Sequence, residues 1–436
     1  MAKGDDAPVP TSRIGRFARV AKLAGGVAGG MLAEGSRRLR AGERPRARDM
    51  LLTPGNARRV ADELASMRGA AMKMGQMLSM DGGDFLPKEL TDILARLRSD
   101  ADNMPPAQLN ETMSGAYGED WEDQFYGFDA RPIAAASIGQ VHKTHAPDGR
   151  EIVLKVQYPG VAKSIDSDVD NIAGLLRLSG LLPEGVDIGP LLQEAKTQLR
   201  AEANYLVEAD YLAAFGELLA DDQRFIVPEV LPELTTEHVL AMTYIHSTPI
   251  EVIAELDQSQ RDQLLSAMID LMLREFFELR MVQTDPNFAN YRYQSSTGRI
   301  VLLDFGATRR FKAGFVNNYK RMLRAALAAD TDGLLAAAEK LGYLVETDNR
   351  AYLELVVEIF AIVLEPLTSE GPYDFGRSDI SARLAAIGET VQDFREFWQA
   401  PPSDAVFFHR KVGGMFLLAQ RMQARVDVNQ LVRQWL

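Results

Sequence analysis

Two short acidic segments bracket a predicted hairpin, and they constrain the fold more than any other part of this 436-residue chain. The first segment is QTDPNFANY, residues 283–291, and the second is LLDFGAT, residues 302–308. Between them lie two runs rich in β-formers that are joined by the turn SSTG, NYRYQ at 290–294 and RIVLLD at 299–304. Because a hairpin returns both of its ends to one edge of a sheet, Asp285 and Asp304 are expected on the same side of a small sheet.

The residue types in these segments suit the binding of a nucleotide with Mg²⁺. Asp285 and Asn290 are five residues apart, which is the separation of the base Asp and the metal-binding Asn in kinase catalytic loops. Asp304 ends a strand and is followed by Phe-Gly, an arrangement that aims a carboxylate at Mg²⁺ in kinase-like folds. Asp285 and Asn290 could instead cap turns. The combination of both segments favours the metal-nucleotide interpretation.

A second hairpin supplies a candidate phosphate-binding lysine. GQVHKT at 139–144 and EIVLKV at 151–156 read as strands joined by the turn APDG. Lys155 fits the strand lysine that holds α- and β-phosphates, and such a lysine needs a glutamate from a helix. A helix is predicted over 190–219, and it carries Glu202 and Glu208. The two glutamates are about 120° apart around a helix, so they cannot serve Lys155 equally.

The loop before the lysine strand departs from the glycine-rich pattern of ordinary kinases. A kinase would show G-x-G-x-x-G here, whereas this chain has AAASIGQVH at 134–142. We assign the following loop residues to nucleotide contacts: Ala134, Ala135, Ala136, Ser137, Ile138, Gly139 and Gln140. Alanine lacks much of the positive-φ freedom of glycine, so we expect a stiffer loop that holds the nucleotide differently. No HRD arginine precedes Asp285, and no APE follows the DFG.

A polar pair interrupts an apolar helical stretch near the N-terminus. GAAMKMGQMLSM, residues 69–80, carries Lys73 and Gln76 on one helical face, with Gly75 between them. A glycine in a helix interior costs about 1 kcal/mol relative to alanine, so a close approach to the backbone is expected there. A lysine that snorkels at the edge of a core helix is the alternative.

Composition narrows the classes of function. The chain has no cysteine, which excludes disulfides, thiolate metal sites and cysteine nucleophiles and suits a reducing compartment. Residues 1–60 carry a net charge of +8 against −13 for the whole chain. A basic arm on an acidic body argues against nucleic-acid binding by the body and suits contact with anionic lipid. The uncharged run at 23–33 is too short to span a bilayer, so we predict a peripheral membrane-facing segment, with a flexible linker as the alternative.

Several motifs in order resemble the UbiB-type atypical kinases, and most of all the branch that supports coenzyme Q biosynthesis in mitochondria and α-proteobacteria. The motifs are AAASIGQVH, the KxGQ of Lys73 and Gln76, TDPNFAN and LLDFGATR. The resemblance runs from about residue 11 to residue 435, and it includes QYPGVAKSIDSDVDN at 157–171 and HRKVGG at 409–414.

The resemblance implies an α+β fold, bilobal and protein-kinase-like, with an N-terminal helical extension packed across the active site. The expected parts are a basic arm over 1–53, the KxGQ extension over 54–120, a β-rich lobe over 121–245 with one long helix over 190–219, and a helical lobe over 246–436.

The resemblance also implies roles for individual residues. Lys155 pairs with Glu208, Asp285 takes the position of the catalytic base, and the metal ligands are Asn290 and Asp304. Met242 and Tyr244 are assigned to nucleotide contacts. Lys73 and Gln76 reach the nucleotide cleft and meet an E-x-D motif, which reads Glu202-Ala203-Asn204 here. Asn204 removes the second carboxylate of that motif, so any role of that acid is lost.

Two functional hypotheses follow, with a third disfavoured. The first is an Mg²⁺-dependent enzyme that binds ATP or ADP, an ATPase or small-molecule kinase in ubiquinone biosynthesis. The second is a nucleotide-sensing pseudokinase scaffold without phosphoryl transfer. A conventional protein kinase is disfavoured because the extension would occupy the peptide-docking surface.

The expected partners are a nucleotide, a membrane lipid or quinone precursor, other quinone-biosynthesis proteins and a second copy of the chain, with no nucleic acid. The expected location is the cytoplasmic face of a bacterial inner membrane, or the mitochondrial matrix face in a eukaryote.

Overall fold

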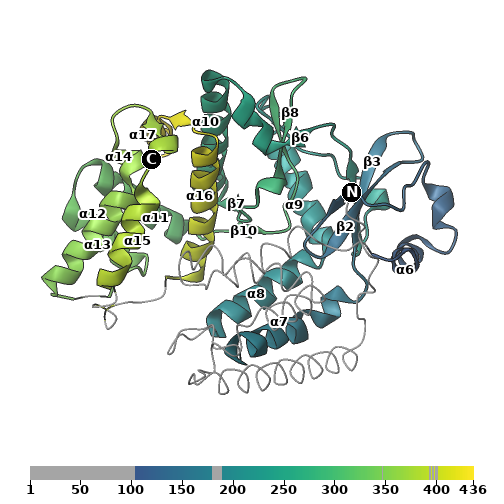
Figure 1. Ribbon diagram of the computed structural model, residues 1–436, viewed down its shortest axis with the longest axis horizontal. Coiled ribbons are helices and arrows are strands. Elements are labelled where there is room, and N and C mark those ends of the chain that lie inside the picture. Colours follow the sequence, from purple (N-terminus) through teal and green to yellow (C-terminus); the bar gives the residue numbers. More distant parts are fainter. Residues whose placement is uncertain (1–103, 179–188, 346, 392–393, 395–396, 398–400) are drawn as a thin grey trace, which may run out of the picture. The chain divides into compact units, whose positions relative to one another are not determined.

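The computed structural model describes residues 104–178, 189–345, 347–391, 394, 397 and 401–436 (Figure 1). The chain divides into two compact units. The first contains the described residues up to Ala214 together with Pro228–Tyr244, and the second contains Phe215–Val227 and Ile245–Leu436. The predicted arm, and most of the predicted extension with Lys73 and Gln76, lie outside the described residues.

The first unit is built on a four-stranded antiparallel sheet in the order β1-β2-β3-β5. Its strands are β1 (Ala134–Ala135), β2 (Gly139–His145), β3 (Glu151–Gln157) and β5 (Val239–Thr243). The predicted hairpin of β2 and β3 is confirmed, with His142 opposite Leu154 in the register. β3 is the inner strand between β2 and β5, and its residues after Glu151 are all buried. Lys155 is therefore held on a buried strand.

Helices complete the first unit. They are α6 (Pro106–Tyr117), η1 (Trp121–Gln124), α7 (Val161–Leu178), α8 (Gly189–Glu202) and α9 (Tyr205–Leu218), with the short turn η2 (Pro232–Leu234). Leu109 and Met113 of α6 join Trp121 and the buried side chains of β3 and β5 in one hydrophobic cluster. α7 and α8 pack together, and Lys196 of α8 pairs with Asp170 of α7 at 2.6 Å.

The single long helix predicted over 190–219 is wrong, because the chain breaks between Glu202 and Tyr205. Asn204 causes the break. Its side-chain oxygen accepts a hydrogen bond from the backbone N–H of Leu206 at 3.0 Å. Its carbonyl accepts from the N–H of Val207 at 3.1 Å. An asparagine that satisfies free N–H groups in this way starts a new helix. Asn204 therefore begins α9, the helix that carries Glu208.

The described residues of the second unit form three small sheets. The largest has the order β4-β9-β8-β6, with β4 parallel to β9 and the other pairs antiparallel. The predicted hairpin between the two acidic segments is confirmed as β8 and β9, with Tyr291 opposite Leu302. The strands of this unit are β4 (Phe225–Ile226), β6 (Thr248–Pro249), β7 (Met281–Gln283), β8 (Tyr291–Gln294), β9 (Arg299–Leu302), β10 (Thr308–Arg310), β11 (Tyr373–Asp374) and β12 (Arg425–Val426).

Helices make up the rest of the second unit, as predicted. They are α10 (Gln258–Arg274), α11 (Ala313–Leu327), α12 (Thr331–Lys340), α13 (Arg350–Val363), α14 (Glu365–Thr368), α15 (Ile380–Val391), α16 (Ser403–Arg421) and α17 (Val428–Arg433). Shorter turns are η3 (Ile250–Glu255), η5 (Phe288–Asn290) and η6 (Phe375–Arg377). A short π-helix, η4 (Glu275–Leu279), continues α10. The next residue, Arg280, has a positive φ of 51° and directly precedes β7.

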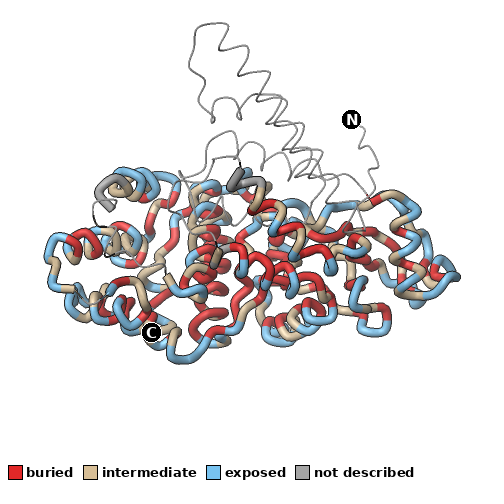
Figure 2. Tube along the Cα trace, turned by 90° about the horizontal axis from the view of Figure 1, so that it is seen from below, coloured by how far each residue is buried: buried red, intermediate tan, exposed pale blue. Residues whose placement is uncertain are grey.

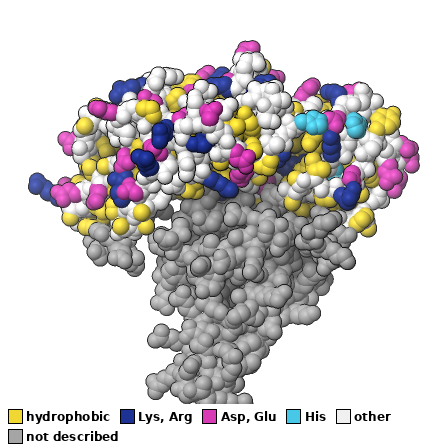
Figure 3. All heavy atoms as spheres, turned by 45° about the horizontal axis from the view of Figure 1, so that its top comes forward, with side chains coloured by type: hydrophobic (Ala, Val, Ile, Leu, Met, Phe, Trp, Pro, Cys, Tyr) yellow, Lys and Arg dark blue, Asp and Glu magenta, His cyan; other side chains and the backbone are white. Residues whose placement is uncertain are grey.

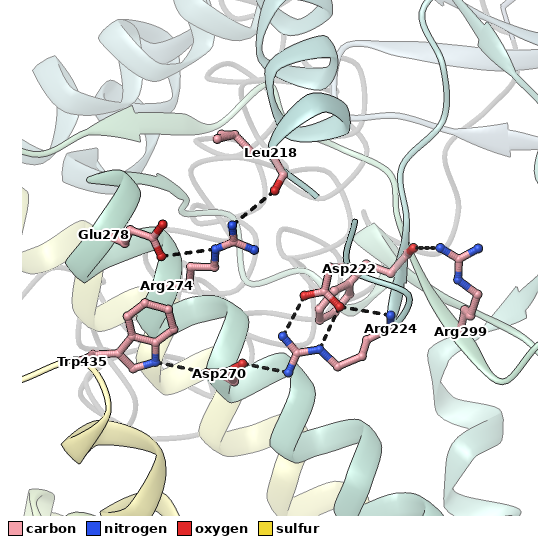
Figure 4. Close-up of polar contacts among 9 residues, drawn as sticks. Leu218, Asp222, Arg224, Asp270, Arg274, Glu278, Arg299 and Trp435 are labelled. Carbon is pink, nitrogen blue, oxygen red and sulfur yellow. Dashed lines mark hydrogen bonds and ion pairs between the residues drawn. The ribbon is translucent and has the colours of Figure 1, made fainter. Parts of the chain in front are cut away.

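Polar contacts explain why the segment Phe215–Val227 belongs to the second unit, although the sequence-based boundaries placed it in the first (Figure 4). Arg224 pairs with Asp270 of α10 at 2.7 Å, and Asp270 accepts from the indole N–H of Trp435 at 3.1 Å. Arg274 of α10 donates to the carbonyl of Leu218, the last residue of α9. Hydrogen bonds from Arg224 also lower the pKa of Asp222. The segment and the C-terminal residues are therefore tied to the same helix.

An aromatic cluster forms part of the core of the second unit. Phe276 is fully buried and stacks on Phe408 of α16 with ring centroids 3.7 Å apart. Phe311, Phe315 and Tyr319 pack edge-on against the same ring. Buried and exposed residues alternate along the helices in Figure 2, the pattern expected of amphipathic helices around a core.

A buried histidine borders this cluster and gives the protein a predicted pH dependence. The hydroxyls of Tyr319 and Tyr343 lie 2.6 and 2.8 Å from Nε2 of His409. Burial lowers the pKa of His409 from 6.5 to about 4. The unfolded chain therefore binds more protons than the folded chain between these two pH values, and stability falls as the pH drops through that window.

We expect the free energy of unfolding to fall by about 2 kcal/mol between pH 7 and pH 5 through His409 alone. Urea unfolding of the wild type and of His409→Gln at both pH values measures this contribution, because other titrating groups are common to both proteins. The same pH dependence in both proteins would show that His409 is not the source.

Two further observations concern the surface of the described part. No helix within it is long and apolar enough to cross a membrane. On the face drawn in Figure 3, acidic and basic side chains of the described residues are interspersed, without a broad patch of either sign.

Candidate active site

The candidate site residues of the first unit centre on Lys155. Nζ of Lys155 donates to both carboxylate oxygens of Glu208, at 2.7 and 2.9 Å. Both side chains are buried, with 7% and 2% of their surface exposed. The ring of Tyr205 lies 5.2 Å from the same ammonium group. A buried charge pair with two hydrogen bonds fixes the lysine in one orientation.

The other candidate glutamate has a different neighbour. Glu202 is the last residue of α8, and its Oε2 accepts a hydrogen bond from the hydroxyl of Ser137 at 3.1 Å. The structure thus places Glu208 against Lys155 and Glu202 against the alanine-rich loop. Asn204, which stands where the E-x-D motif has its second acid, uses its side chain to cap α9.

The alanine-rich loop is a tight turn between β1 and β2. The backbone N–H of Ala136 donates to the carbonyl of Gly139 at 2.9 Å and closes the turn. Ala134 and Ala135 are exposed, and Ala136 and Ser137 are partly exposed. These four residues are the solvent-accessible part of the loop.

The three later loop residues are buried in the first unit. Ile138 is 1% exposed, and Gln140 accepts from the backbone N–H of Met104 at 2.8 Å and contacts His142 at 2.8 Å. A Cβ on Gly139 would lie 2.3 Å from the carbonyl oxygen of Val156, so only glycine fits there. The contacts of these three residues are internal, and their assignment to the nucleotide stays a prediction.

Met242 and Tyr244 lie on or just beyond β5. Met242 is buried and stands opposite Val153 in the sheet. Tyr244 is partly buried, and the ammonium of Lys143 lies 4.2 Å from its ring centroid. Its backbone N–H donates to the carbonyl of Glu151 at 2.9 Å. Tyr244 is also the last residue of the first unit.

In the second unit, backbone pairing brings the two acidic segments together. Both the N–H and the hydroxyl of Thr284 donate to the carbonyl of Ala307, at 3.2 and 2.7 Å. At the other end of the loop, the carbonyl of Asn290 accepts from the N–H of Leu303 at 3.0 Å. Asp285 follows Thr284, and Asp304 follows Leu303. The two segments therefore lie side by side as expected, but between two separate sheets, the pair β7–β10 at one end and the pair β8–β9 at the other.

Local hydrogen bonds shape both acidic loops. Asp285 accepts from the backbone N–H of Asn287 at 3.3 Å, and Asp304 accepts from that of Gly306 at 3.0 Å. Phe305 is buried and packs on Phe215 with ring centroids 4.5 Å apart. The buried phenylalanine anchors the DFG turn in the second unit.

The oxygen donors of the second unit suit a hard cation. Asn290 is 8% exposed, and its side-chain Nδ2 is buried without a hydrogen-bond partner within the described chain. No group of three or more His, Cys, Asp or Glu residues that could hold a metal occurs among the described residues. One carboxylate and one amide oxygen fit Mg²⁺, which usually binds few protein ligands and completes its shell with phosphate and water.

Sequence reasoning gave no role to α16, although it noted HRKVGG. The structure places Lys411 and Gly414 of this motif beside the loop that carries Asp285. The available signal was a lysine followed by two adjacent glycines inside an otherwise apolar helical stretch.

Comparison with known proteins identifies the family and the fold. The model of the ABC1 atypical kinase-like domain matches residues 96–338. The chain is 37% identical to the mitochondrial atypical kinase COQ8 of Saccharomyces cerevisiae, over 98% of this chain and 85% of that protein. It is 38% identical to the mitochondrial atypical kinase COQ8B of Rattus norvegicus, over 97% of this chain and 80% of that protein.

Two further matches are less complete. The mitochondrial atypical kinase coq-8 of Caenorhabditis elegans is 36% identical over 99% of this chain, which spans 58% of that protein. The structure of Rv3197 from Mycobacterium tuberculosis, solved with erythromycin, covers 87% of this chain and 95% of its own at a TM-score of 0.60 and 24% identity. That likeness shows the shared fold. The kinase-like α+β fold and the family expected from the motifs are thereby confirmed, and the chain belongs to the ABC1 atypical kinase-like family.

Proposed function

We propose that the chain is an Mg²⁺-dependent enzyme that binds ATP or ADP, an ATPase or small-molecule kinase that supports coenzyme Q biosynthesis at a membrane. The buried pair of Lys155 and Glu208 is the observation that carries the proposal. Phosphoryl transfer depends on positioning and on charge neutralisation. Glu208 fixes the ammonium of Lys155, which can then both orient the phosphates and neutralise their charge.

Within this proposal, the first unit binds the phosphates. Lys155 neutralises the α- and β-phosphates, and Glu208 holds its ammonium in place. Ala134 to Ser137 cover the nucleotide, with Glu202 bracing the loop through Ser137. Met242 and Tyr244 contact the base.

The second unit supplies the chemistry at the transferred phosphate. Asn290 and Asp304 would hold Mg²⁺, whose charge offsets the negative charge of the phosphates. Asp285 orients the attacking hydroxyl or water and accepts its proton. The backbone hydrogen bonds Thr284–Ala307 and Asn290–Leu303 join the two segments that carry these three residues.

A scaffold that senses nucleotide without phosphoryl transfer is the second candidate. The alanine-rich loop favours it, because alanines wrap phosphates less freely than glycines. Its buried second half also fixes the loop to the sheet. The two candidates differ in turnover, since the scaffold binds nucleotide without hydrolysing it.

The proposed partners are a quinone precursor or membrane lipid, other quinone-biosynthesis proteins and a second copy of the chain, without nucleic acid. In a bacterium the chain would lie on the cytoplasmic face of the inner membrane, and in a mitochondrion on the matrix face. The net charge of +8 on residues 1–60, which include the basic arm, supports contact with anionic lipid.

Quinone profiling of a strain that lacks this chain tests the proposal. Expression of the wild type, or of Asp221→Asn as a matched control at an exposed acid, is expected to restore quinone levels. Asp304→Asn is expected to leave them low at equal protein abundance. Full rescue by Asp304→Asn would favour the scaffold, and no quinone defect in the deletion strain would contradict the proposal altogether.

A further inference from the structure

A buried polar cluster holds both ends of the loop 284–290. Lys411 of α16 forms an ion pair with Glu275 of the π-helix η4 at 3.5 Å, with 4% and 2% of the side-chain surfaces exposed. Lys411 also donates to the hydroxyl of Tyr291 at 2.8 Å and lies 3.4 Å from Oε1 of Gln283. Gln283 and Tyr291 are the residues that flank the loop.

The same helix also touches the middle of the loop. A Cβ on Gly414 would lie 2.2 Å from Cβ and 3.1 Å from Cα of Pro286, the residue after Asp285. Contacts under about 3 Å are far inside van der Waals separation, so a side chain at this position must displace the loop. The preceding residue, Gly413, would meet no atom within 4 Å. Gly413 and Gly414 are adjacent in α16, but only Gly414 faces the loop.

We propose that Lys411 and Gly414 are positioning residues for the loop 284–290, and that through it they set the placement of Asp285 and Asn290. The inference rests on the proposed function of these two residues. Lys411 fixes the loop at its two ends, and Gly414 lets α16 lie against its centre.

A contribution to folding stability does not by itself explain the buried cluster around Lys411. Buried ion pairs contribute little net stability compared with apolar residues of similar size, because the desolvation penalty offsets the attraction. Their directional hydrogen bonds, by contrast, select one arrangement of the groups that they join. The partners of Lys411 come from η4, β7 and β8, so its ammonium joins the three elements around the loop.

Gly414→Ala with Gly413→Ala as its control tests the inference. We expect Gly414→Ala to lower kcat for nucleotide turnover at least 10-fold with KM changed less than 3-fold, and to accelerate amide hydrogen exchange in residues 284–290. Gly413→Ala should match the wild type in all three. In an Asp285→Asn background, Gly414→Ala should cause a smaller further loss than in the wild type, because one of the two groups that the loop places is already altered.

Tyr291→Phe is the variant that keeps the fold if Gly414→Ala does not. It removes only the hydroxyl that accepts from Lys411, and it should lower kcat several-fold and accelerate exchange in the loop with little change in Tm. Wild-type exchange in 284–290 in either folded variant would overturn the inference, as would an additive loss with Asp285→Asn.

Failure of the proposed function gives a different result. A wild type without nucleotide binding or turnover would contradict that function, whereas hydrogen exchange in the loop still decides whether α16 positions it.

Discussion

Asp304→Asn is expected to abolish Mg²⁺-dependent nucleotide turnover and leave the fold intact. Asn keeps the shape of the side chain and an oxygen that can accept from the N–H of Gly306, so the DFG turn is preserved. The substitution removes the negative charge that a hard cation requires. We expect kcat to fall at least about 100-fold, the scale seen when one charge-stabilising group is lost from an active site.

Steady-state turnover with varied Mg²⁺ measures this loss, and the thermal midpoint without nucleotide monitors the fold. Asp221→Asn is the matched control, since Asp221 is an exposed acid of the same unit. Turnover by Asp304→Asn at the wild-type rate would contradict the assignment of Asp304 to the metal.

Lys155→Met is expected to lower both stability and nucleotide binding. It leaves the Glu208 carboxylate buried without the ammonium that donates to both of its oxygens. Removing one partner of a buried ion pair costs about 3–5 kcal/mol of unfolding free energy. Nucleotide turnover should fall as well, because the phosphates lose a fixed positive charge.

The double variant Lys155→Met with Glu208→Leu separates the two effects. Replacing both charges with apolar side chains should recover most of the lost stability, as at other buried pairs. Nucleotide turnover should stay low, because the ammonium of Lys155 is still absent. Recovery of turnover together with stability would show that the pair only supports the fold. Urea unfolding and turnover on the three proteins measure both quantities.

Local patterns allowed much of this site to be predicted from the sequence. The hairpin of β8 and β9 and that of β2 and β3 follow from β-rich runs joined by turn residues, whose preferences are local. The contact of Asn290 with Leu303 follows from the hairpin of β8 and β9, which brings its two ends together. These features depend on residues close together in the chain.

The errors and omissions have identifiable physical causes. The break between α8 and α9 depends on one side chain, that of Asn204, which caps a helix inside an otherwise helical pattern. The parallel pairing of β4 with β9 joins Phe225 to Ile300, and no local signal encodes such a contact. Long-range contacts of this kind also explain why the segment 215–227 belongs to the second unit and not to the first, as the sequence had suggested.

The role of α16 could not be predicted from the sequence, because it also depends on long-range contacts. Lys411 and Glu275 are far apart in the sequence, and each alone reads as an ordinary charged residue of a helix. Only their burial beside the loop of Asp285 identifies them. The close approach of Gly414 to Pro286 likewise becomes visible only once the helix is placed on the loop.

Calorimetric titration of ADP into the purified full-length chain, with and without Mg²⁺, tests the central claim most directly. We expect saturable binding that requires Mg²⁺ in the wild type and is lost in Asp304→Asn. We also expect slow ATP turnover by the same wild-type preparation. Absence of nucleotide binding in the wild type, or binding that is indifferent to both Mg²⁺ and Asp304, would contradict the claim.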